Sequence, residues 1–169
     1  MEKILSAYER GWLEAAIDGE GSLGLYFGHL KTSPRPRVNA RLQIANSDER
    51  FVKKAQEIMG VGTIAHSKAT QRRKTVYRLS VYSSKLRPIL PQLSLVVKRR
   101  QQVLLEEAMS LLGKRYGRLG HAGGICRPLW KDRRLEEIKA ELHRLNGGQV
   151  RPSTLLGLVA TSTRQEEER

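Results

Sequence analysis

The chain has 169 residues, and its 31 lysines and arginines outnumber 17 acids to give a formal net charge of +14. An excess of this size favours a polyanionic partner, with nucleic acid as the leading candidate. Charge alone does not separate DNA from RNA, and a basic surface that serves only solubility is the alternative. The length and the hydrophobic content of 39% suit one folded domain, which we assign to residues 1–160, with a polar tail at 161–169.

The same composition argues against several other classes. No apolar run approaches the roughly 18 residues of a membrane span, and an amphipathic helix rather than a secretory apolar block is predicted after Met1. The single cysteine, Cys126, excludes a disulfide within the chain, and the histidines at 29, 66, 121 and 143 have no zinc-ligand spacing. We therefore expect an intracellular protein that has neither a membrane partner nor a small-molecule substrate.

The most informative segment is an apolar helix that ends in two acids and two glycines. Residues 12–21 are Trp-Leu-Glu-Ala-Ala-Ile-Asp-Gly-Glu-Gly. Ser6 and Glu9 have the spacing of a capping box, which predicts a helix from about residue 7 to about residue 18. Small residues leave little bulk on one side of this helix and permit a second backbone to approach closely; these are Ala15, Ala16 and Gly19.

Oxygen ligands are predicted at the carboxyl end of this helix. The last carbonyls of a helix lack internal partners and carry partial negative charge. Glu20 stands beside the Gly19 carbonyl, and together they offer the hard oxygen ligands that Mg²⁺ prefers. The alternative is that Glu20 only caps a turn.

The segment 13–21, Leu-Glu-Ala-Ala-Ile-Asp-Gly-Glu-Gly, resembles the signature motif of the LAGLIDADG homing endonucleases, and a strand-like Ser-Leu-Gly-Leu-Tyr-Phe follows it as in that family. Only one copy is present, so the resemblance implies a homodimer in which the two motif helices pack at the interface. Glu14 and Ala15 depart from the common Ala-Gly, and Glu14 must point away from that interface. The resemblance implies interface or bracing roles for Trp12, Ala15, Ala16 and Asp18.

A first hairpin is predicted after the motif. Leu23, Leu25 and Phe27 alternate with glycine and tyrosine, which is the period of a half-buried strand. A basic turn at 31–37 interrupts the pattern, and apolar residues then alternate with polar ones through 38–44. One face of this hairpin suits a core, and the other suits bases and phosphates because it carries Arg37, Asn39, Arg41 and Gln43.

A second helix and a second hairpin are predicted next. The helix begins near Asn46, is closed by Gly60, and directs Phe51, Ala55 and Ile58 inward. Residues 63–67 and 75–82 have the pattern of paired strands around a basic loop. The register of the strand at 63–67 is not fixed by the sequence, so the side on which His66 lies stays open.

Helices complete the chain. They are predicted over 95–112 and 129–145, with a glycine-rich loop at 113–124 between them and an apolar turn at 155–159. The element order predicts an α+β fold with an antiparallel sheet covered on one face. It matches, over roughly residues 6–112, the αββαββα core of the family that the motif resembles. That resemblance implies a four-stranded, saddle-shaped sheet that lies in the DNA major groove, followed here by C-terminal helices.

The resemblance implies an active site built around the motif acids. Glu20 and the Gly19 carbonyl of each subunit would hold Mg²⁺ beside the scissile phosphates, whereas Asp18 would brace the helix end. Lys98 lies near the start of a predicted helix, where a cation is disfavoured unless an anionic partner is present. Its segment resembles the one whose lysine lies close to the scissile phosphate and organises water. A solvated basic helix face is the alternative for Lys98 and more so for Arg99 and Arg100.

Asn46 has two interpretations that can coexist. The resemblance implies that it contacts the water network of the active site, as a polar residue at the end of the second strand. It is also suited to cap the helix that follows. Arg50 is a weaker candidate for the same site.

The predicted DNA contacts fall into two groups. In the major groove arginine pairs with guanine and asparagine or glutamine with adenine, and the outward strand residues suited to this are Tyr26, Arg37, Asn39, Arg41, Gln43 and Arg78. Loop cations at the ends of the sheet are expected to hold phosphates and set the register; they are Arg35, Lys68, Arg72, Arg73 and Lys74.

These observations predict a Mg²⁺-dependent, intron-encoded homing endonuclease that acts as a homodimer and cuts both strands of a long, nearly palindromic duplex. One alternative is an RNA maturase that promotes intron splicing, which would not need Glu20 as a metal ligand. The other is a DNA-binding regulator on the same scaffold that does not cleave, against which the intact Asp-Gly-Glu-Gly argues.

Overall fold

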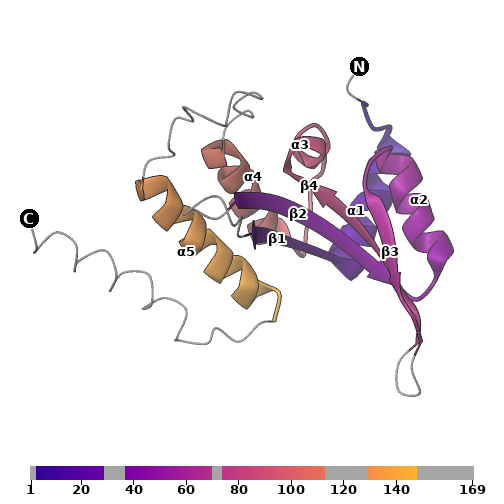
Figure 1. Ribbon diagram of the computed structural model, residues 1–169. Coiled ribbons are helices and arrows are strands. Elements are labelled where there is room, and N and C mark those ends of the chain that lie inside the picture. The colour runs from indigo at the N-terminus through magenta and orange to yellow at the C-terminus, as the bar shows by residue number, and fades with distance from the viewer. Residues whose placement is uncertain (1–2, 29–36, 70–73, 113–128, 148–169) are drawn as a thin grey trace, which may run out of the picture.

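The computed structural model describes residues 3–28, 37–69, 74–112 and 129–147, but not the side chains of residues 37 and 129. Within these ranges the chain forms a four-stranded antiparallel sheet with helices, the α+β architecture that the sequence predicts (Figure 1). No helix in the described ranges is long and apolar enough to cross a membrane. The predicted turn at 155–159, the tail and the glycine-rich loop at 113–124 lie outside the described residues.

Helix α1, Ala7–Glu20, begins where its capping box predicts. The Glu9 N–H donates to the Ser6 hydroxyl at 3.2 Å, and the Ser6 N–H donates to the Glu9 carboxylate at 2.8 Å. This bond from the Ser6 backbone is the largest cause that lowers the pKa of Glu9 to about 2. The helix runs two residues further than predicted, so that Gly19 and Glu20 form its last turn.

The sheet consists of β1 (Gly21–Gly28), β2 (Arg37–Asn46), β3 (Thr63–Ser67) and β4 (Val76–Tyr82) in the order β1-β2-β4-β3. Both predicted hairpins are therefore present, and their second strands lie side by side at the centre. Alternation sends every second side chain to a core that the helices cover. The buried strand residues are Leu23, Val38, Ala40, Leu42, Ile44, Leu79 and Val81.

Helix α2, Glu49–Met59, ends at Gly60, whose φ of 65° is the left-handed conformation expected of a helix C-cap. Its N-cap is Asp48, not Asn46: the Asp48 carboxylate accepts the Arg50 N–H at 2.9 Å. Asn46 acts one step earlier, because its side-chain oxygen accepts the Asp48 N–H at 2.8 Å and turns the chain toward the cap.

The predicted helix from residue 95 begins later than expected. Two short helices, α3 (Ser83–Leu86) and η1 (Leu90–Gln92), precede α4, which spans Arg99–Leu112. Residues 96–98 form a bend and a turn ahead of the helix, and their N–H groups bond to the Asp18 carboxylate. The last helix, α5, spans Leu129–Leu145 as predicted.

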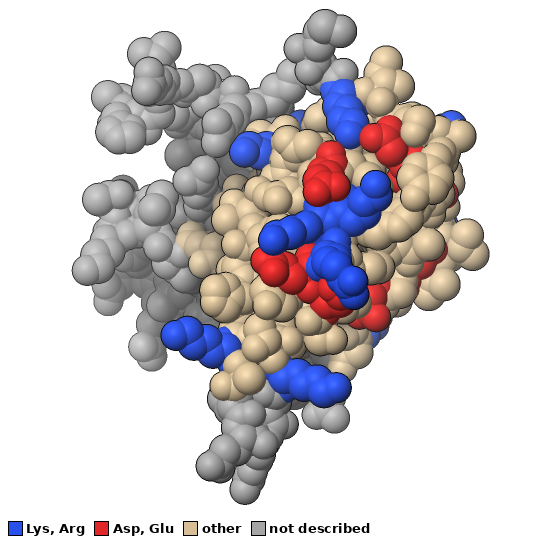
Figure 2. Space-filling view, turned by 90° about the vertical axis from the view of Figure 1, so that its right-hand side faces the viewer, with Lys and Arg blue, Asp and Glu red and all other residues tan. Residues whose placement is uncertain are grey.

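The side of the molecule on which α2 lies carries both signs of charge (Figure 2). Arg50 pairs with Asp48 at 2.8 Å, and Lys53 pairs with Glu49 at 3.0 Å. The two cations are largely exposed and the two acids are partly exposed, so these pairs add little to stability. They do mean that the positive excess of the chain is not concentrated on this side.

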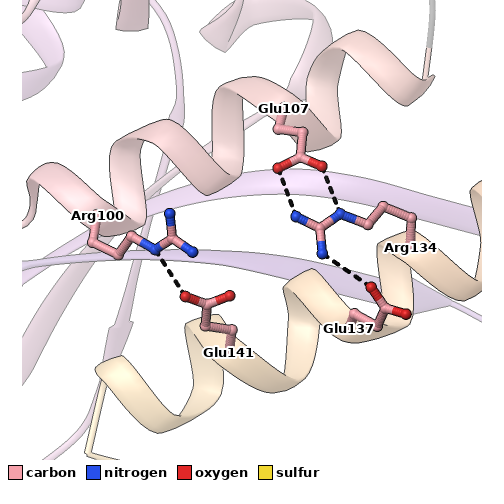
Figure 3. Close-up of polar contacts among 5 residues, drawn as sticks. All are labelled: Arg100, Glu107, Arg134, Glu137 and Glu141. Carbon is pink, nitrogen blue, oxygen red and sulfur yellow. Dashed lines mark hydrogen bonds and ion pairs between the residues drawn. The ribbon is translucent and has the colours of Figure 1, made fainter.

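Helices α4 and α5 lie side by side and are joined by ion pairs (Figure 3). The Arg134 guanidinium binds both carboxylate oxygens of Glu107, at 2.6 and 3.0 Å, and reaches Glu137 at 2.9 Å. The hydrogen bond from Arg134 lowers the pKa of Glu107. Arg100 pairs with Glu141 at 2.8 Å, so this cation, one of the basic run at 98–100, is engaged with α5.

Candidate active site and nucleic-acid interface

The Asp18 carboxylate, in the last turn of α1, organises the approach to α4. It accepts the N–H groups of Val96 at 2.8 Å, Val97 at 3.2 Å and Lys98 at 2.9 Å. Partial burial of the carboxylate raises its pKa, but the three backbone hydrogen bonds outweigh that effect, and the pKa of Asp18 lies below its ordinary value. Asp18 is therefore a charged anchor for residues that are about 80 positions away in the sequence.

The Lys98 side chain returns to the same helix end. Its Nζ donates to the Ile17 carbonyl at 2.8 Å and also to the Asp18 carbonyl. The sequence predicts an anionic partner at this helix start, and the structure provides one within the chain, the Asp18 carboxylate. Lys98 is half-buried and directed at α1, so the solvated-face interpretation does not describe it.

Glu20 and Gly19 are the last two residues of α1, and both are exposed. They directly follow the carbonyls that Lys98 occupies, and β1 begins at the next residue. Gly21 makes this tight exit possible, because a Cβ there would lie 2.6 Å from the Ile17 carbonyl oxygen. The predicted metal ligands thus lie together, at the junction of α1 with the sheet.

The donor chemistry at this junction fits a hard divalent cation in part. A carboxylate and a backbone carbonyl are oxygen donors of the type that Mg²⁺ takes, but the ion needs about six of them. The described residues contain no group of three or more His, Cys, Asp or Glu side chains that could hold a metal. The described residues of one chain therefore do not complete such a ligand shell by themselves.

Asn46 is the last residue of β2, so it lies at the end of the sheet where β1 begins, two residues after Ile44, which pairs with Gly21. One of its side-chain atoms, Oδ1, is used by the Asp48 N–H. Arg50 is paired elsewhere: its guanidinium binds both oxygens of Asp48, at 3.1 and 2.8 Å. The structure therefore brings Asn46 to the sheet end near Glu20 and holds Arg50 on the Asp48 side chain.

The predicted small-residue face of α1 is only partly correct. Ala15 and Gly19 are exposed, but Ala16 is 5% exposed and packs into the core of its own chain, so it is unavailable to a second subunit. Trp12 is half-buried against Phe51, with ring centroids 5.2 Å apart. Small exposed residues on this helix recur every four residues, at Gly11, Ala15 and Gly19, while Tyr8 and Arg10 are exposed near its start.

Glu14 points away from that exposed face, as expected. Its carboxylate accepts the Ser94 N–H at 2.7 Å. Together with Asp18, it holds the segment that precedes α4 against α1.

The sheet face opposite the helices presents its side chains in rows. Counted from the Glu20 end, the register gives Ala45–Arg78–Ala65, then Ser22–Gln43–Ser80–Thr63, then Gly24–Arg41–Tyr82, and finally Tyr26–Asn39. None of these residues is acidic. The face therefore combines positive charge with hydrogen-bonding and aromatic groups, in contrast to the mixed charges beside α2.

The predicted base-contacting residues differ in solvent exposure and in whether a hydrogen bond already fixes their side chain. Tyr26 and Arg78 are exposed, whereas Asn39, Arg41 and Gln43 are half-buried. The Gln43 amide nitrogen donates to the Ser80 hydroxyl at 3.1 Å, which fixes its orientation. Arg37 is the first residue of β2, on the same register parity as Asn39 and Arg41.

Tyr82 belongs to this face and was missed by the sequence analysis. It is 44% exposed and lies opposite Arg41, in the same row. Val76, Arg78 and Ser80 alternate along the strand, and the same alternation places residue 82 on their face. The sequence pattern could therefore have predicted Tyr82 there.

His66 is placed by the register that the sequence left open. It pairs with Tyr77, on the parity of the buried Leu79, and so lies on the helix side of the sheet at its edge. The two rings are 6.1 Å apart.

The predicted phosphate-binding loops are described in part. Lys68 and Lys74 are exposed at the end of the β3–β4 hairpin, which projects from the molecule in Figure 1. Arg35, Arg72 and Arg73 lie outside the described residues.

Solved structures of homing endonucleases share this fold, whereas no family model and no curated protein matches the chain. The archaeal intron-encoded I-Vdi141I, complexed with DNA, has a TM-score of 0.71 and 17% identity over 95% of this chain and 98% of its own. I-CvuI, in complex with a DNA target in the presence of Mg, has a TM-score of 0.61 and 16% identity over 85% of each chain. The I-SmaMI LAGLIDADG homing endonuclease, bound to cleaved DNA, has a TM-score of 0.57 and 16% identity over 79% of this chain and 46% of its own.

The chain therefore has the fold of the LAGLIDADG homing endonucleases, as its motif and element order predict. Within that fold, the motif Asp18-Gly-Glu-Gly21 ends α1 at the edge of an open, basic sheet face.

Proposed function

We propose that this chain is a homing endonuclease: a homodimer that makes a site-specific double-strand cut in a long, pseudo-palindromic DNA duplex with the help of Mg²⁺. One observation carries the proposal. The exposed oxygen ligands Gly19 and Glu20 stand at the end of a four-stranded face that carries arginines and no acid among its described residues.

Duplex DNA suits this face better than RNA does. The major groove of B-DNA is wide enough for a β-ribbon, and base edges there present a distinct pattern for each base pair. The major groove of A-form RNA is too deep and narrow for side chains to enter. A broad sheet whose central strands carry Arg41 and Arg78 in open rows is therefore matched to DNA.

The rows predict the order in which the arginines contact one half of the proposed DNA site. Arg78 lies in the row next to Glu20, and Arg41 lies two rows farther out. Two rows correspond to four residues, or about 13 Å of strand, comparable with about four base-pair steps. We therefore assign Arg78 to a position near the cut and Arg41, flanked by Tyr82, to a position farther from it.

The chemistry is assigned to the end of α1. Glu20 and the Gly19 carbonyl would hold Mg²⁺, which activates water and stabilises charge on the phosphate when bound. Lys98 places a positive charge on the preceding carbonyls, those of Ile17 and Asp18, where it can meet a phosphate. Asn46, whose amide nitrogen is not the atom used for Asp48, would orient water.

A second copy of the chain completes the site in this proposal. Each chain offers one Glu20, whereas two strands must be cut. The exposed face of α1, with Gly11, Ala15 and Gly19, is the surface through which two copies would bring their Glu20 residues together. By its resemblance to the motif family, we infer that the enzyme is intron-encoded.

The test is incubation of the purified protein with Mg²⁺ and a library of duplex sites, followed by sequencing of the cut ends. We expect cuts in both strands at one family of sites with two-fold symmetry. Binding without cuts would favour a DNA-binding regulator, and preference for structured intron RNA would favour a maturase; either result contradicts the proposal.

A further inference from the structure

The end of α1 already holds a cation that belongs to the chain. Lys98 Nζ donates to the carbonyls of Ile17, at 2.8 Å, and of Asp18. These two carbonyls directly precede Gly19 and Glu20. The negative end of the helix dipole is therefore compensated by an ammonium group that carries a full positive charge.

Little negative charge remains at this helix end for a second cation. The Asp18 carboxylate is committed to the N–H groups of Val96, Val97 and Lys98. Glu20 is then the one acid of the motif that is exposed, and it lies two residues after Asp18, whose carbonyl Lys98 binds. The Lys98 ammonium group, held on the same helix turn, repels a divalent ion that approaches Glu20 and so offsets part of the attraction of the carboxylate.

Resting on the proposed function, we infer that Lys98 keeps divalent metal off the Glu20 site until DNA binds. A phosphate brings negative charge that offsets the ammonium and oxygen atoms that complete the ligand shell. Metal and DNA then bind cooperatively, and by linkage the metal raises the affinity for DNA by the same factor. The free protein holds no metal at its nuclease site and cannot act before a target is engaged.

Metal binding to the DNA-free protein tests this inference directly. Mn²⁺ is titrated against wild-type protein, Lys98→Gln and Arg99→Gln, and free Mn²⁺ is measured by electron paramagnetic resonance. Arg99 is the next residue and is exposed, so Arg99→Gln removes the same charge without touching the α1 carbonyls. We expect Lys98→Gln to lower the Kd for Mn²⁺ about tenfold, the size of a close charge repulsion in water. Arg99→Gln should stay within about twofold because salt screens the distant charge.

A double variant locates the ion. Adding Glu20→Gln to Lys98→Gln should abolish the gained affinity. Lys98→Met, of similar length and uncharged, repeats the test if the glutamine variant melts early by circular dichroism. Equal affinities of Lys98→Gln and Arg99→Gln, or a gain that survives Glu20→Gln, would overturn the inference. Because no DNA is present, these outcomes are independent of whether the wild-type protein cuts DNA, which is what the proposed function requires.

Discussion

Asp18 and Lys98 are joined by two hydrogen bonds, in each of which the side chain of one residue binds the backbone of the other. The Asp18 carboxylate accepts the Lys98 N–H at 2.9 Å, and Lys98 Nζ donates to the Asp18 carbonyl. The end of α1 and the start of α4 are thereby fixed relative to one another, although they are far apart in the sequence. The proposed metal ligands and the proposed catalytic lysine consequently share one rigid junction.

Loss of the Asp18 charge should destabilise this junction. We expect Asp18→Asn to lower the free energy of unfolding by about 1–3 kcal/mol, because three backbone N–H groups lose a charged acceptor. Glu14→Gln, which alters the acceptor of the single Ser94 N–H, is the matched control and should cost less. Chemical denaturation of the three proteins at neutral pH measures both changes.

The effect of Asp18 should depend on pH with a definite sign. Its pKa is depressed in the folded chain, so its stabilisation is complete above its ordinary value of 3.8 and is lost as pH falls through the folded pKa. The gap in unfolding free energy between wild type and Asp18→Asn should therefore close in acid. A gap that stays constant down to complete protonation would contradict the assignment of a charged anchor.

Replacement of Gly21 by alanine should destabilise the protein, whereas the same replacement at Gly24 should not. A Cβ at residue 21 would lie 2.6 Å from the Ile17 carbonyl oxygen and 2.8 Å from the Ile17 Cα, and a Cβ at residue 24 would meet nothing within 4 Å. We expect Gly21→Ala to cost about 1–3 kcal/mol of stability. Gly24→Ala should be neutral or slightly stabilising, since alanine restricts the unfolded chain. Equal losses of thermal stability in the two variants would argue against a close approach of Gly21 to Ile17 at the end of α1.

Arg41 and Arg78 should affect different positions of the DNA target. Each alanine variant should relax discrimination by roughly 1–3 kcal/mol at one position of each half-site, the usual worth of a bidentate arginine–guanine pair. The position affected by Arg78→Ala should lie nearer the cut than the one affected by Arg41→Ala, because Arg78 is in the row next to Glu20. Selection of bound duplexes from a randomised pool gives both positions, and the reverse order would refute the proposed alignment.

The exposed face of α1 should govern assembly. We expect a dimer at micromolar concentration by light scattering and a monomer for Ala15→Glu, which places a charge among the small residues of that face. Ser110→Glu is the control, because Ser110 is exposed on α4, away from α1. A wild-type monomer, or equal effects of the two variants, would count against a site shared between two copies.

Local signals explain what the sequence predicted well. The Ser6–Glu9 capping box and Gly60 act within one helical turn, and strand alternation depends only on neighbours, so helix ends and strand faces follow from short stretches. The choice between Asn46 and Asp48 as the α2 cap was harder. Both side chains accept a backbone N–H two residues later, and the sequence alone does not rank them.

Long-range contacts explain the errors. Residues 95–97 continue the apolar pattern of α4, but the helix begins only at Arg99, after a turn that Asp18 holds through the N–H groups of 96–98; this contact between distant parts of the chain is not encoded in the local pattern. Ala15 and Ala16 are equally small, and only the packing of α1 on the sheet decides that Ala16 faces the core. The side of His66 follows from pairing with β4, which the short strand does not encode by itself.

The central claim is that Glu20 holds the metal that cuts DNA, and one pair of measurements on Glu20→Gln tests it. Cleavage of a selected target in Mg²⁺ and affinity for the same duplex in Ca²⁺ are compared with wild type. We predict that cleavage is abolished while affinity stays within a few-fold, because the sheet face that binds DNA is unchanged. Cutting at the wild-type rate by Glu20→Gln would contradict the account.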